Sequence, residues 1–366
     1  MHAPLRKVII GFFEINIYHL KRIITKQHSE TIKHFEELSK FVEENDLIVD
    51  IESGLSSIFL LGDKIPLKSV FDFFSGEKFS ILESFEEFEA SYHLAKYGFY
   101  KQSMVSLRVA LDIGLLSIYW SIIGAEDKSF KDWYSSKNES PRKDKKFWEV
   151  LRSDSNIDYF SQNFNLKKEI SELGILSDFV HTKGLYHSNF GKVKRKMKGQ
   201  DKFQDFLVWL NNFKGVVRIL EILHLLRYPT MCLDYSTAFL LSKFGTFNRI
   251  PQFGGGLGDE KKYVFSFLKK EETDLIESLA DENKEVQRIK DWLSSIPDLN
   301  EKEIRRIVIE EQKNNIMDGG FENWEKFAHV HDHRIDDKMI TDLKEWARKN
   351  KCMSLEEVIK NIDSKK

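Results

Sequence analysis

The stretch QSMVSLRVALDIGLLSIYWSIIG, residues 102–124, is almost continuously apolar and predicts a long buried helix that ends at its terminal glycine. An amphipathic run comes before it, with large apolar side chains at helical spacing from Leu82 to Ala95. Only a short break around Gly98 separates the two runs, and glycine commonly ends helices. Because so short a joint leaves consecutive helices side by side, we expect an antiparallel helical hairpin.

The composition of the 366-residue chain is typical of a folded, mainly helical protein. Hydrophobic residues make up 41% of it, and it contains only 6 prolines, the residue that most strongly interrupts helices. The 56 lysines and arginines nearly balance the 58 acidic residues, so only local basic patches can indicate a nucleic-acid partner. We therefore predict an all-α fold: an up-and-down helical bundle core with helical N- and C-terminal extensions.

The pattern divides the chain into three regions. Residues 1–75 are expected to be mixed but mostly helical, with apolar spacings of three and four over 14–45 and a short strand or loop at DLIVDIES, residues 46–53. Residues 76–230 carry the helical bundle. Residues 231–366 begin with a turn-rich, glycine-rich linker and continue as charged helices.

Within the bundle region, residues 126–146 are expected to form a polar loop, after which helices resume near Phe147 and Leu166. The second of these is expected to stop at Gly184. A last helix is predicted from Phe203 to Arg227, because the residue before the following proline avoids helical geometry.

The cysteines and the N-terminus favour a cytoplasmic protein. Cys232 and Cys352 lie far apart in the sequence and outside any CxxC pair, which indicates a reducing compartment without a disulfide framework. The N-terminus lacks a small-residue cleavage site. The most apolar stretch, Val109 to Ala125, contains Asp112 and is short for a membrane span, so we expect a buried helix and no membrane partner.

The motif LSDFVHTKGLYH, residues 176–187, places a histidine in the last turn of a predicted helix. The partial negative charge of a helix C-terminus favours a protonated imidazole, and a group that titrates near neutrality can transfer protons. Ser177 lies one turn before His181 on the same face. The alternative is that His181 only caps the final carbonyl groups.

Arg108 and Asp112 project from one face of the apolar helix, four residues apart. Charges in such a helix must be paired, because an unpaired buried charge costs several kcal/mol. They either pair with each other and fix the position of the helix, or the arginine presents its fork to a phosphate or carboxylate.

Two basic segments lie in the same region and predict contact with a phosphate backbone if they lie near His181. The alternative is that they are ordinary solvated loops. The first follows the histidine motif and the second lies in the polar loop; their members are Lys183, Lys192, Lys194, Arg195, Lys196, Lys198 and Lys202, and Arg142, Lys143, Lys145 and Lys146.

Other motifs give no firm site. HVHDH, residues 329–333, alternates histidines as a zinc-binding strand would, but no strand pattern surrounds it. FGGGLG, residues 253–258, lacks the lysine and hydroxyl of a phosphate-binding loop and is interpreted as a linker. We therefore expect no cofactor and no metal.

YHLAKYGFYKQSMVSLRVALDIGLLSIYW and the later ILSDFVHTKG resemble the HEPN-like helical superfamily, over roughly residues 80–230. The resemblance implies a four- or five-helix bundle, often dimeric. It also implies a metal-independent ribonuclease of bacterial toxin–antitoxin or antiviral systems, in which a histidine deprotonates the ribose 2′-OH and an arginine stabilises the phosphorane.

The family's arginine precedes its histidine by five to seven positions, and His181 has no such arginine. Two other pairs fit that spacing: Arg22 with His28, and Arg218 with His224. Arg218 and His224 lie in the predicted last helix of the bundle and are the alternative catalytic pair, although the apolar residues between them indicate a core position.

The sequence therefore supports two functional hypotheses. In the first, the protein is a metal-independent ribonuclease or RNA-binding effector of a bacterial stress or antiviral defence system, dimeric and with a cognate defence or antitoxin protein as partner. His181 transfers the proton, Arg108 holds the phosphate, and Asp112 orients one of them. In the second, the same three residues form a buried structural network in a non-catalytic interaction module.

Overall fold

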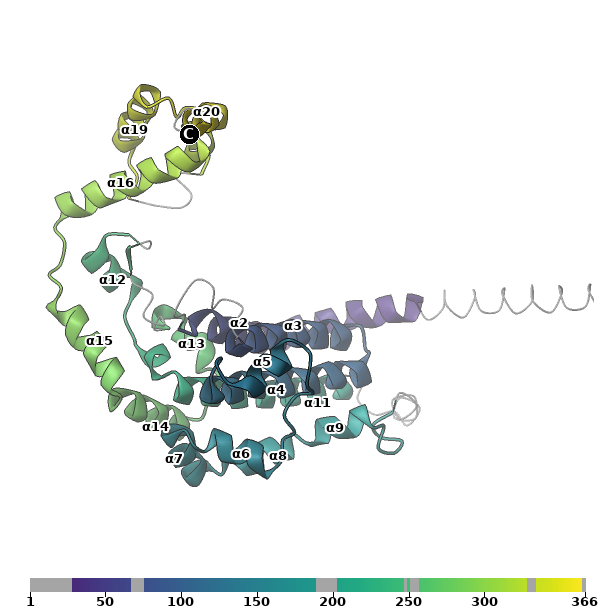
Figure 1. Ribbon diagram of the computed structural model, residues 1–366. Helices are drawn as coiled ribbons and strands as arrows, with labels where there is room; N and C mark the ends of the chain where they lie inside the picture. Colours follow the sequence, from purple (N-terminus) through teal and green to yellow (C-terminus); the bar gives the residue numbers. More distant parts are fainter. Residues whose placement is uncertain are drawn as a thin grey trace, which may run out of the picture. The chain divides into compact units, whose positions relative to one another are not determined.

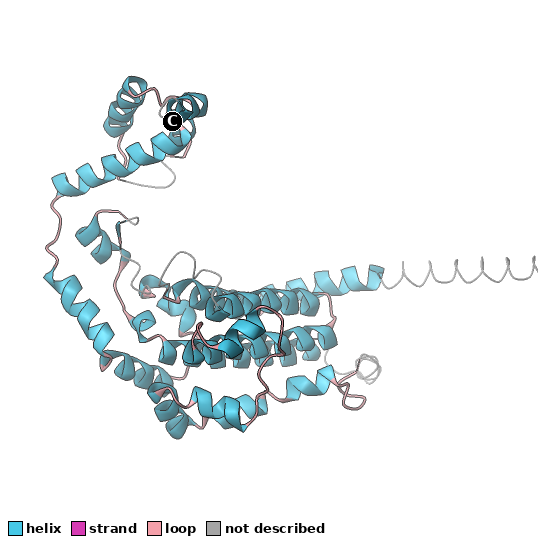
Figure 2. Cartoon of the chain, viewed as in Figure 1, coloured by secondary structure: helices cyan, strands magenta, loops and turns pink. Residues whose placement is uncertain are grey.

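The computed structural model describes residues 28–66, 76–188, 203–246, 249–250, 257–327 and 334–363, and these residues form helices and turns without a strand (Figures 1 and 2). The all-α prediction is therefore confirmed. The described residues belong to two compact units. The first unit comprises the described parts of Met1–Leu233 and Gly254–Asn283, and the second comprises those of Asp234–Phe253 and Lys284–Lys366.

Residues 28–44 open the first unit as a helix. Its further helices are α2 (Leu47–Lys64), α3 (Gly76–Lys96), α4 (Tyr100–Ile123), α5 (Lys128–Tyr134), α6 (Lys145–Leu151), α7 (Ser155–Phe164), α8 (Leu166–Glu172), α9 (Ile175–Val180), α11 (Gln204–Arg227), η2 (Pro229–Cys232), η4 (Gly258–Glu260), α13 (Lys261–Val264) and α14 (Lys270–Asp281). Those of the second unit are α12 (Thr237–Phe244), α15 (Lys284–Ser295), α16 (Glu301–Gly319), α17 (Phe321–Glu325), α19 (Asp337–Lys349) and α20 (Leu355–Asp363).

The predicted hairpin is present as α3 and α4, which pack along their length (Figure 1). Gly98 has φ 80°, a conformation that suits glycine, and its N–H donates to Ala95 O at 2.9 Å while Phe99 N–H donates to Leu94 O at 2.8 Å. These bonds satisfy carbonyl groups at the end of α3 and reverse the chain within three residues.

The core of the first unit is built on α11, the last long helix of the bundle. Its Trp209, Phe213 and Leu220 have no exposed surface, and α2, α3 and α4 all pack against the helix. Close approach depends on small residues: a Cβ on Gly114 of α4 would lie 2.5 Å from Leu220 Cδ1, and one on Gly54 of α2 would lie 2.4 Å from a carbon of the Phe213 ring.

The domain boundaries differ from the three predicted regions. The N-terminal α2 packs against α3 and α11, while α13 packs against α2 and α14 against α11. Leu257, Val264 and Ile276, which lie after the predicted linker, belong to the same buried cluster as the hairpin. The bundle therefore includes residues on both sides of the predicted region 76–230.

Three local predictions were wrong. The helix expected from near Leu166 to Gly184 is divided into α8 and α9, and α9 already ends at Val180. Residues 46–53 are neither strand nor loop but the start of α2, in which Ile51 and Ile58 face the core at helical spacing. The expected polar loop 126–146 contains α5, whose first turn is capped by Asp127 accepting from Ser129 N–H at 2.7 Å. The last bundle helix begins and ends within one residue of the prediction.

The second unit has a smaller core of its own, contributed by α16, α17, α19 and the segment around α20. Buried Ile316, Phe321 and Leu343 are among its members. The start of α20 is capped from both sides: Ser354 Oγ accepts from Glu357 N–H at 3.3 Å, and the Glu357 carboxylate accepts from Met353 N–H at 2.9 Å.

One helix among the described residues, α4, is long and apolar enough to cross a membrane by length and composition. Its Leu107, Leu111 and Leu115 have no exposed surface because they line the core of the first unit. Burial inside the bundle therefore accounts for the apolar character of α4.

Replacing Gly114 with leucine should destabilise the first unit by about 1–3 kcal/mol, because the new side chain must displace Leu220 at the closest approach of α4 and α11. Urea unfolding monitored by tryptophan fluorescence would measure the loss. The matched change Gly319→Leu, at a position with open space around the Cβ, should be nearly neutral. Equal stability of both variants would contradict the packing described here.

Candidate functional site

Arg108 and Asp112 form the ion pair that their spacing predicted, and Lys143 joins them. The guanidinium Nη2 lies 3.0 Å from Asp112 Oδ1, and Lys143 Nζ pairs with the same carboxylate oxygen. The side chains of Arg108 and Lys143 are 20% exposed and that of Asp112 is 38% exposed. The cluster therefore lies at the edge of the bundle: its side chains are partly exposed, but Asp112 Oδ1 and Lys143 Nζ are themselves buried. It has two basic groups for one carboxylate.

The excess of positive charge affects Lys143 most. Burial, together with repulsion from Arg108, lowers the pKa of Lys143 to about 6, and burial also lowers the pKa of Arg108. An anion near the cluster would favour the protonated form of Lys143. Arg108 is therefore the group of this cluster that stays charged at neutral pH, and an anionic ligand would meet its guanidinium first.

His181 lies apart from this cluster. It is the exposed C-cap of α9, and its backbone N–H donates to Ser177 O at 3.0 Å. The contacts of the described residues connect Arg108 and Asp112 to each other and to Lys143, and none of them reaches His181. The expected cluster of Arg108, Asp112 and His181 inside the bundle therefore does not form. α9 ends at Val180, and His181 after it is exposed to solvent.

The histidine that packs against the protein in this motif is His187. Its ring meets Phe179 edge-on at a centroid distance of 4.8 Å, its Nδ1 lies 2.8 Å from Lys183 O, and its Nε2 lies 4.0 Å from Asp178 Oδ2. Sequence reasoning missed this role. The sequence signal for it was Gly184: this glycine and Thr182 both have positive φ in the structure, and the turn folds the segment back.

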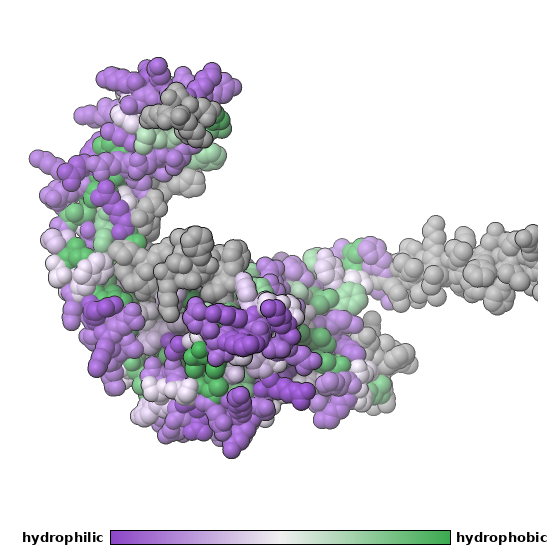
Figure 3. Space-filling view, viewed as in Figure 1, coloured by the Kyte–Doolittle hydropathy of each residue, from purple (hydrophilic) through white to green (hydrophobic). Residues whose placement is uncertain are grey.

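α9 and α4 are joined at one end of the bundle by Lys101, whose Nζ donates to Thr182 Oγ1 at 2.6 Å. Lys101, Arg108 and Asp112 are seven and four residues apart, so they lie on one face of α4 over about 16 Å. We call this face the basic stripe, defined by Lys101, Arg108 and Lys143 around Asp112. On the view in Figure 3 hydrophilic residues cover most of the first unit, with smaller hydrophobic areas between them.

Exposed rings lie at the Lys101 end of the basic stripe. Tyr97 and Phe99, in the turn that leads into α4, are 42% and 47% exposed, and Tyr186, after α9, is 50% exposed. Figure 1 places the α3–α4 turn and the end of α9 at the same end of the bundle. Tyr97 stacks on Phe35 at a centroid distance of 4.9 Å, so Phe99 and Tyr186 are the rings with more exposed surface. Basic side chains beside exposed rings are an arrangement suited to a single-stranded nucleic acid.

The alternative pair, Arg218 and His224, does not form a catalytic pair. Arg218 forms ion pairs with Glu169 of α8, at 3.1 Å, and with Glu272 of α14. Burial alone would raise the pKa of Glu272, but hydrogen bonds from Arg218 and from the Lys269 N–H hold it below its usual value. The guanidinium therefore connects three helices.

His224 is fully buried in the core. Its Nε2 lies 3.2 Å from Ser117 Oγ and its Nδ1 lies 2.8 Å from Leu220 O. Burial lowers the pKa of His224 to about 4. An imidazole without access to solvent or substrate has no role in proton transfer to a ligand, so this residue contributes to packing.

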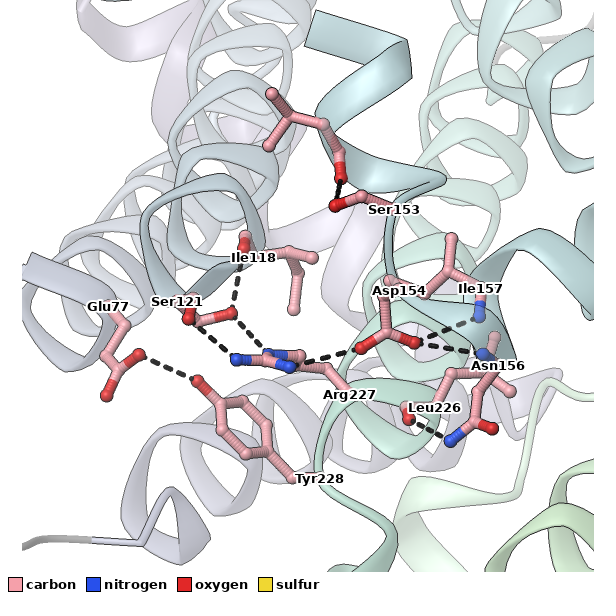
Figure 4. A network of polar contacts seen from close by, with 11 residues as sticks. Glu77, Ile118, Ser121, Ser153, Asp154, Asn156, Ile157, Leu226, Arg227 and Tyr228 are labelled. Carbon is pink, nitrogen blue, oxygen red and sulfur yellow. Dashed lines mark hydrogen bonds and ion pairs between the residues drawn. The ribbon is translucent and has the colours of Figure 1, made fainter. Parts of the chain in front are cut away.

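The carboxyl-terminal end of α11 carries a further polar network that spacing did not reveal (Figure 4). Arg227 donates to Ser121 Oγ at 2.9 Å and to Asp154 Oδ2 at 3.1 Å, and Tyr228 OH donates to Glu77 Oε2 at 3.1 Å. The partners are distant in sequence, so no local motif indicates them. The network fixes α11 to α3, α4 and α7.

Several predicted positions lie outside the described residues. These include Arg22 of the first Arg/His pair, the HVHDH motif, and the lysines and arginine of the segment after the histidine motif: Lys192, Lys194, Arg195, Lys196, Lys198 and Lys202. Lys183 is described, and its Nζ lies 3.3 Å from Asp178 Oδ1. Among the described residues, no three histidine, cysteine or acidic side chains are grouped as a metal site requires.

In comparisons with protein-family models, curated proteins and solved structures, nothing matches this chain.

The two arginines of the sequence hypotheses should differ sharply in their effect on stability. Arg218→Leu should cost about 3 kcal/mol, because it leaves the fully buried Glu272 without its main partner. Arg108→Leu should cost less than about 1 kcal/mol, because its partner Asp112 is exposed to solvent and retains Lys143. Chemical denaturation of the two variants and the wild type provides the comparison, and a large loss for Arg108→Leu alone would reverse the assignment.

Proposed function

We propose that the protein is an RNA-binding effector that holds single-stranded RNA along the basic stripe of α4. The observation that carries the proposal is the position of Lys101 and Arg108 two turns apart on one face of α4, with Lys143 from the segment before α6 beside them at Asp112. Positive side chains spaced along a helix face can follow a phosphate backbone, and binding of this kind releases counterions. The two basic side chains of α4 favour an anionic ligand.

The exposed rings favour a single strand over a duplex. Bases of a single strand can stack on aromatic side chains, whereas those of a duplex are already stacked on each other. Phe99 and Tyr186 are each about half exposed and lie at the end of the basic stripe. In the sequence, the segment after Ser188 contains further lysines and an arginine.

The HEPN-like resemblance supplies the biological part of the proposal. A bundle of this type would act in a bacterial stress or antiviral defence system, as a cytoplasmic homodimer with a cognate defence or antitoxin protein as partner. The all-α bundle is compatible with that resemblance. The alternative of a non-catalytic interaction module is compatible with the buried positions of Arg218 and His224.

Binding to a fluorescently labelled single-stranded RNA should weaken in the double variant Arg108→Met/Lys143→Met. The slope of log K against log salt concentration should also fall by about 0.7 for each lost phosphate contact. Phe99→Ala and Tyr186→Ala should each cost about 1–3 kcal/mol of binding through lost stacking. Fluorescence anisotropy over a salt series measures both effects.

Lys302→Met is a matched control, because Lys302 is exposed on α16 of the second unit. It should leave binding unchanged. If the wild type does not bind RNA, or if the double variant binds as the control does, the proposal is wrong.

A second candidate function, metal-independent RNA cleavage, is favoured by the exposure of His181 next to the Lys101–Thr182 contact. His181 would take the ribose 2′-OH proton, and the 2′-oxygen would displace the 5′-oxygen of the next nucleotide to give a 2′,3′-cyclic phosphate. Lys101 contacts Thr182, the residue after His181, and would stabilise the negative charge of the phosphorane.

Incubation with end-labelled RNA in the presence of a chelator should yield products with 2′,3′-cyclic phosphate ends, and His181→Ala should abolish them. His93→Ala, at an exposed histidine of α3, is the matched control and should cleave as the wild type does. Binding without cleavage would exclude this second function and leave the RNA-binding proposal intact.

A further inference from the structure

Glu221 is the most deeply buried acidic group of α11 without an ion-pair partner. Its side chain has no exposed surface, and Oε1 accepts a hydrogen bond from Ser57 Oγ of α2 at 2.6 Å. Within the part of the chain that the structure describes, Oε2 is buried without a hydrogen-bond partner. A carboxylate in this position would lack both solvent and a counter-ion, so the neutral acid is the form that fits.

The charged groups around Glu221 are already paired with other residues. Arg218, one turn before it on α11, is held by Glu169 of α8 and Glu272 of α14. His224, one turn after it, contacts Ser117 of α4 and is neutral near physiological pH.

Two further titratable groups on the helices packed against α11 are also paired. On α3, Glu77 accepts a hydrogen bond from Tyr228 OH. On α2, Asp50 forms an ion pair with Lys214 of α11. Across the elements packed on α11, the described contacts therefore place no free cation against Glu221. Burial raises the pKa of Glu221 well above its usual value, and the Ser57 hydrogen bond and the charge of Arg218 offset only part of that rise.

We infer that Glu221 is a proton-dependent latch between α2 and α11: the neutral acid keeps the two helices packed, and its ionisation separates them. The contact it controls is tight. Gly54, three residues before Ser57, lies against the Phe213 ring, and Ile58 and Leu61 of α2 are fully buried. A charge at Glu221 needs water, and the packed α2–α11 contact leaves its side chain no exposed surface.

The sign of the pH dependence follows from the two protonation states. An unfolded chain ionises Glu221 near its usual pKa of 4.5, whereas the folded protein keeps the proton to a higher pH. Stability from this group is therefore present below pH 4.5 and is lost as pH rises toward the folded pKa, by up to tenfold in the unfolding equilibrium per pH unit.

His224 acts in the opposite direction. Its pKa is lowered from 6.5 to about 4, so its contribution is lost as pH falls between those values. The two contributions therefore oppose each other where both groups titrate. Above pH 6.5 the contribution of His224 no longer changes with pH, so any further pH dependence of this pair comes from Glu221. The latch is consequently best observed on the alkaline side of neutrality.

The test compares the full-length wild type with Glu221→Gln, which keeps the shape of the side chain but cannot ionise. Urea unfolding is measured between pH 5 and 9. As pH rises, the variant should become more stable relative to the wild type, by up to tenfold in the unfolding equilibrium constant per pH unit, until Glu221 ionises in the folded protein. Groups elsewhere in the protein, such as Lys143, contribute equally to both proteins and cancel.

Hydrogen exchange provides the local measurement. At pH 8 the amides of α2 should exchange faster in the wild type than in Glu221→Gln, while those of α16 in the second unit should be identical. Parallel pH profiles for the two proteins would overturn the inference.

Ser57→Ala keeps the proposal testable if Glu221→Gln folds poorly. Loss of the hydroxyl removes a hydrogen bond that lowers the pKa of Glu221, so the pH-dependent loss should extend to higher pH than in the wild type. An unchanged profile in Ser57→Ala would also count against the latch.

Discussion

Satisfying polar groups inside a helix bundle is the constraint on which this structure depends, and α11 is where it acts. The helix packs against α2, α3, α4, α7 and α14, so polar side chains on it must find partners within the protein. Arg218, His224 and Arg227 each do so through a residue far away in sequence. These bonds select one arrangement of helices from the many that apolar packing alone would allow.

The same constraint decides where chemistry with a ligand can take place. Groups that fix α11 are occupied by their partners and shielded from solvent, which removes Arg218 and His224 from consideration as a working pair. The groups still open to a ligand lie on the outer surface, along α4 and at the end of α9. A binding function for the basic stripe therefore agrees with the packing, because it uses side chains that the core does not need.

Local patterns predicted the fold class and the long helices, because period and glycine position are local properties. The hairpin and α11 followed from apolar spacing, Gly98 and Pro229. The pairing of Arg108 with Asp112 was equally local. By contrast, the partners of Arg218 and the addition of Lys143 to the pair depend on contacts between distant segments, which no spacing rule contains. The course of the chain after α9, which leaves His181 in solvent, depends on such contacts too.

The first unit is discontinuous in the chain, since residues 234–253 belong to the second unit and the bundle resumes only afterwards. During synthesis, α11 emerges well before α14, and until then Arg218 has Glu169 but not Glu272. The bundle therefore reaches its final set of ion pairs only when residue 283 has left the ribosome. A nascent chain that stops at Leu233 would leave a guanidinium partly uncompensated, so synthesis through α14 is a condition for closing the core.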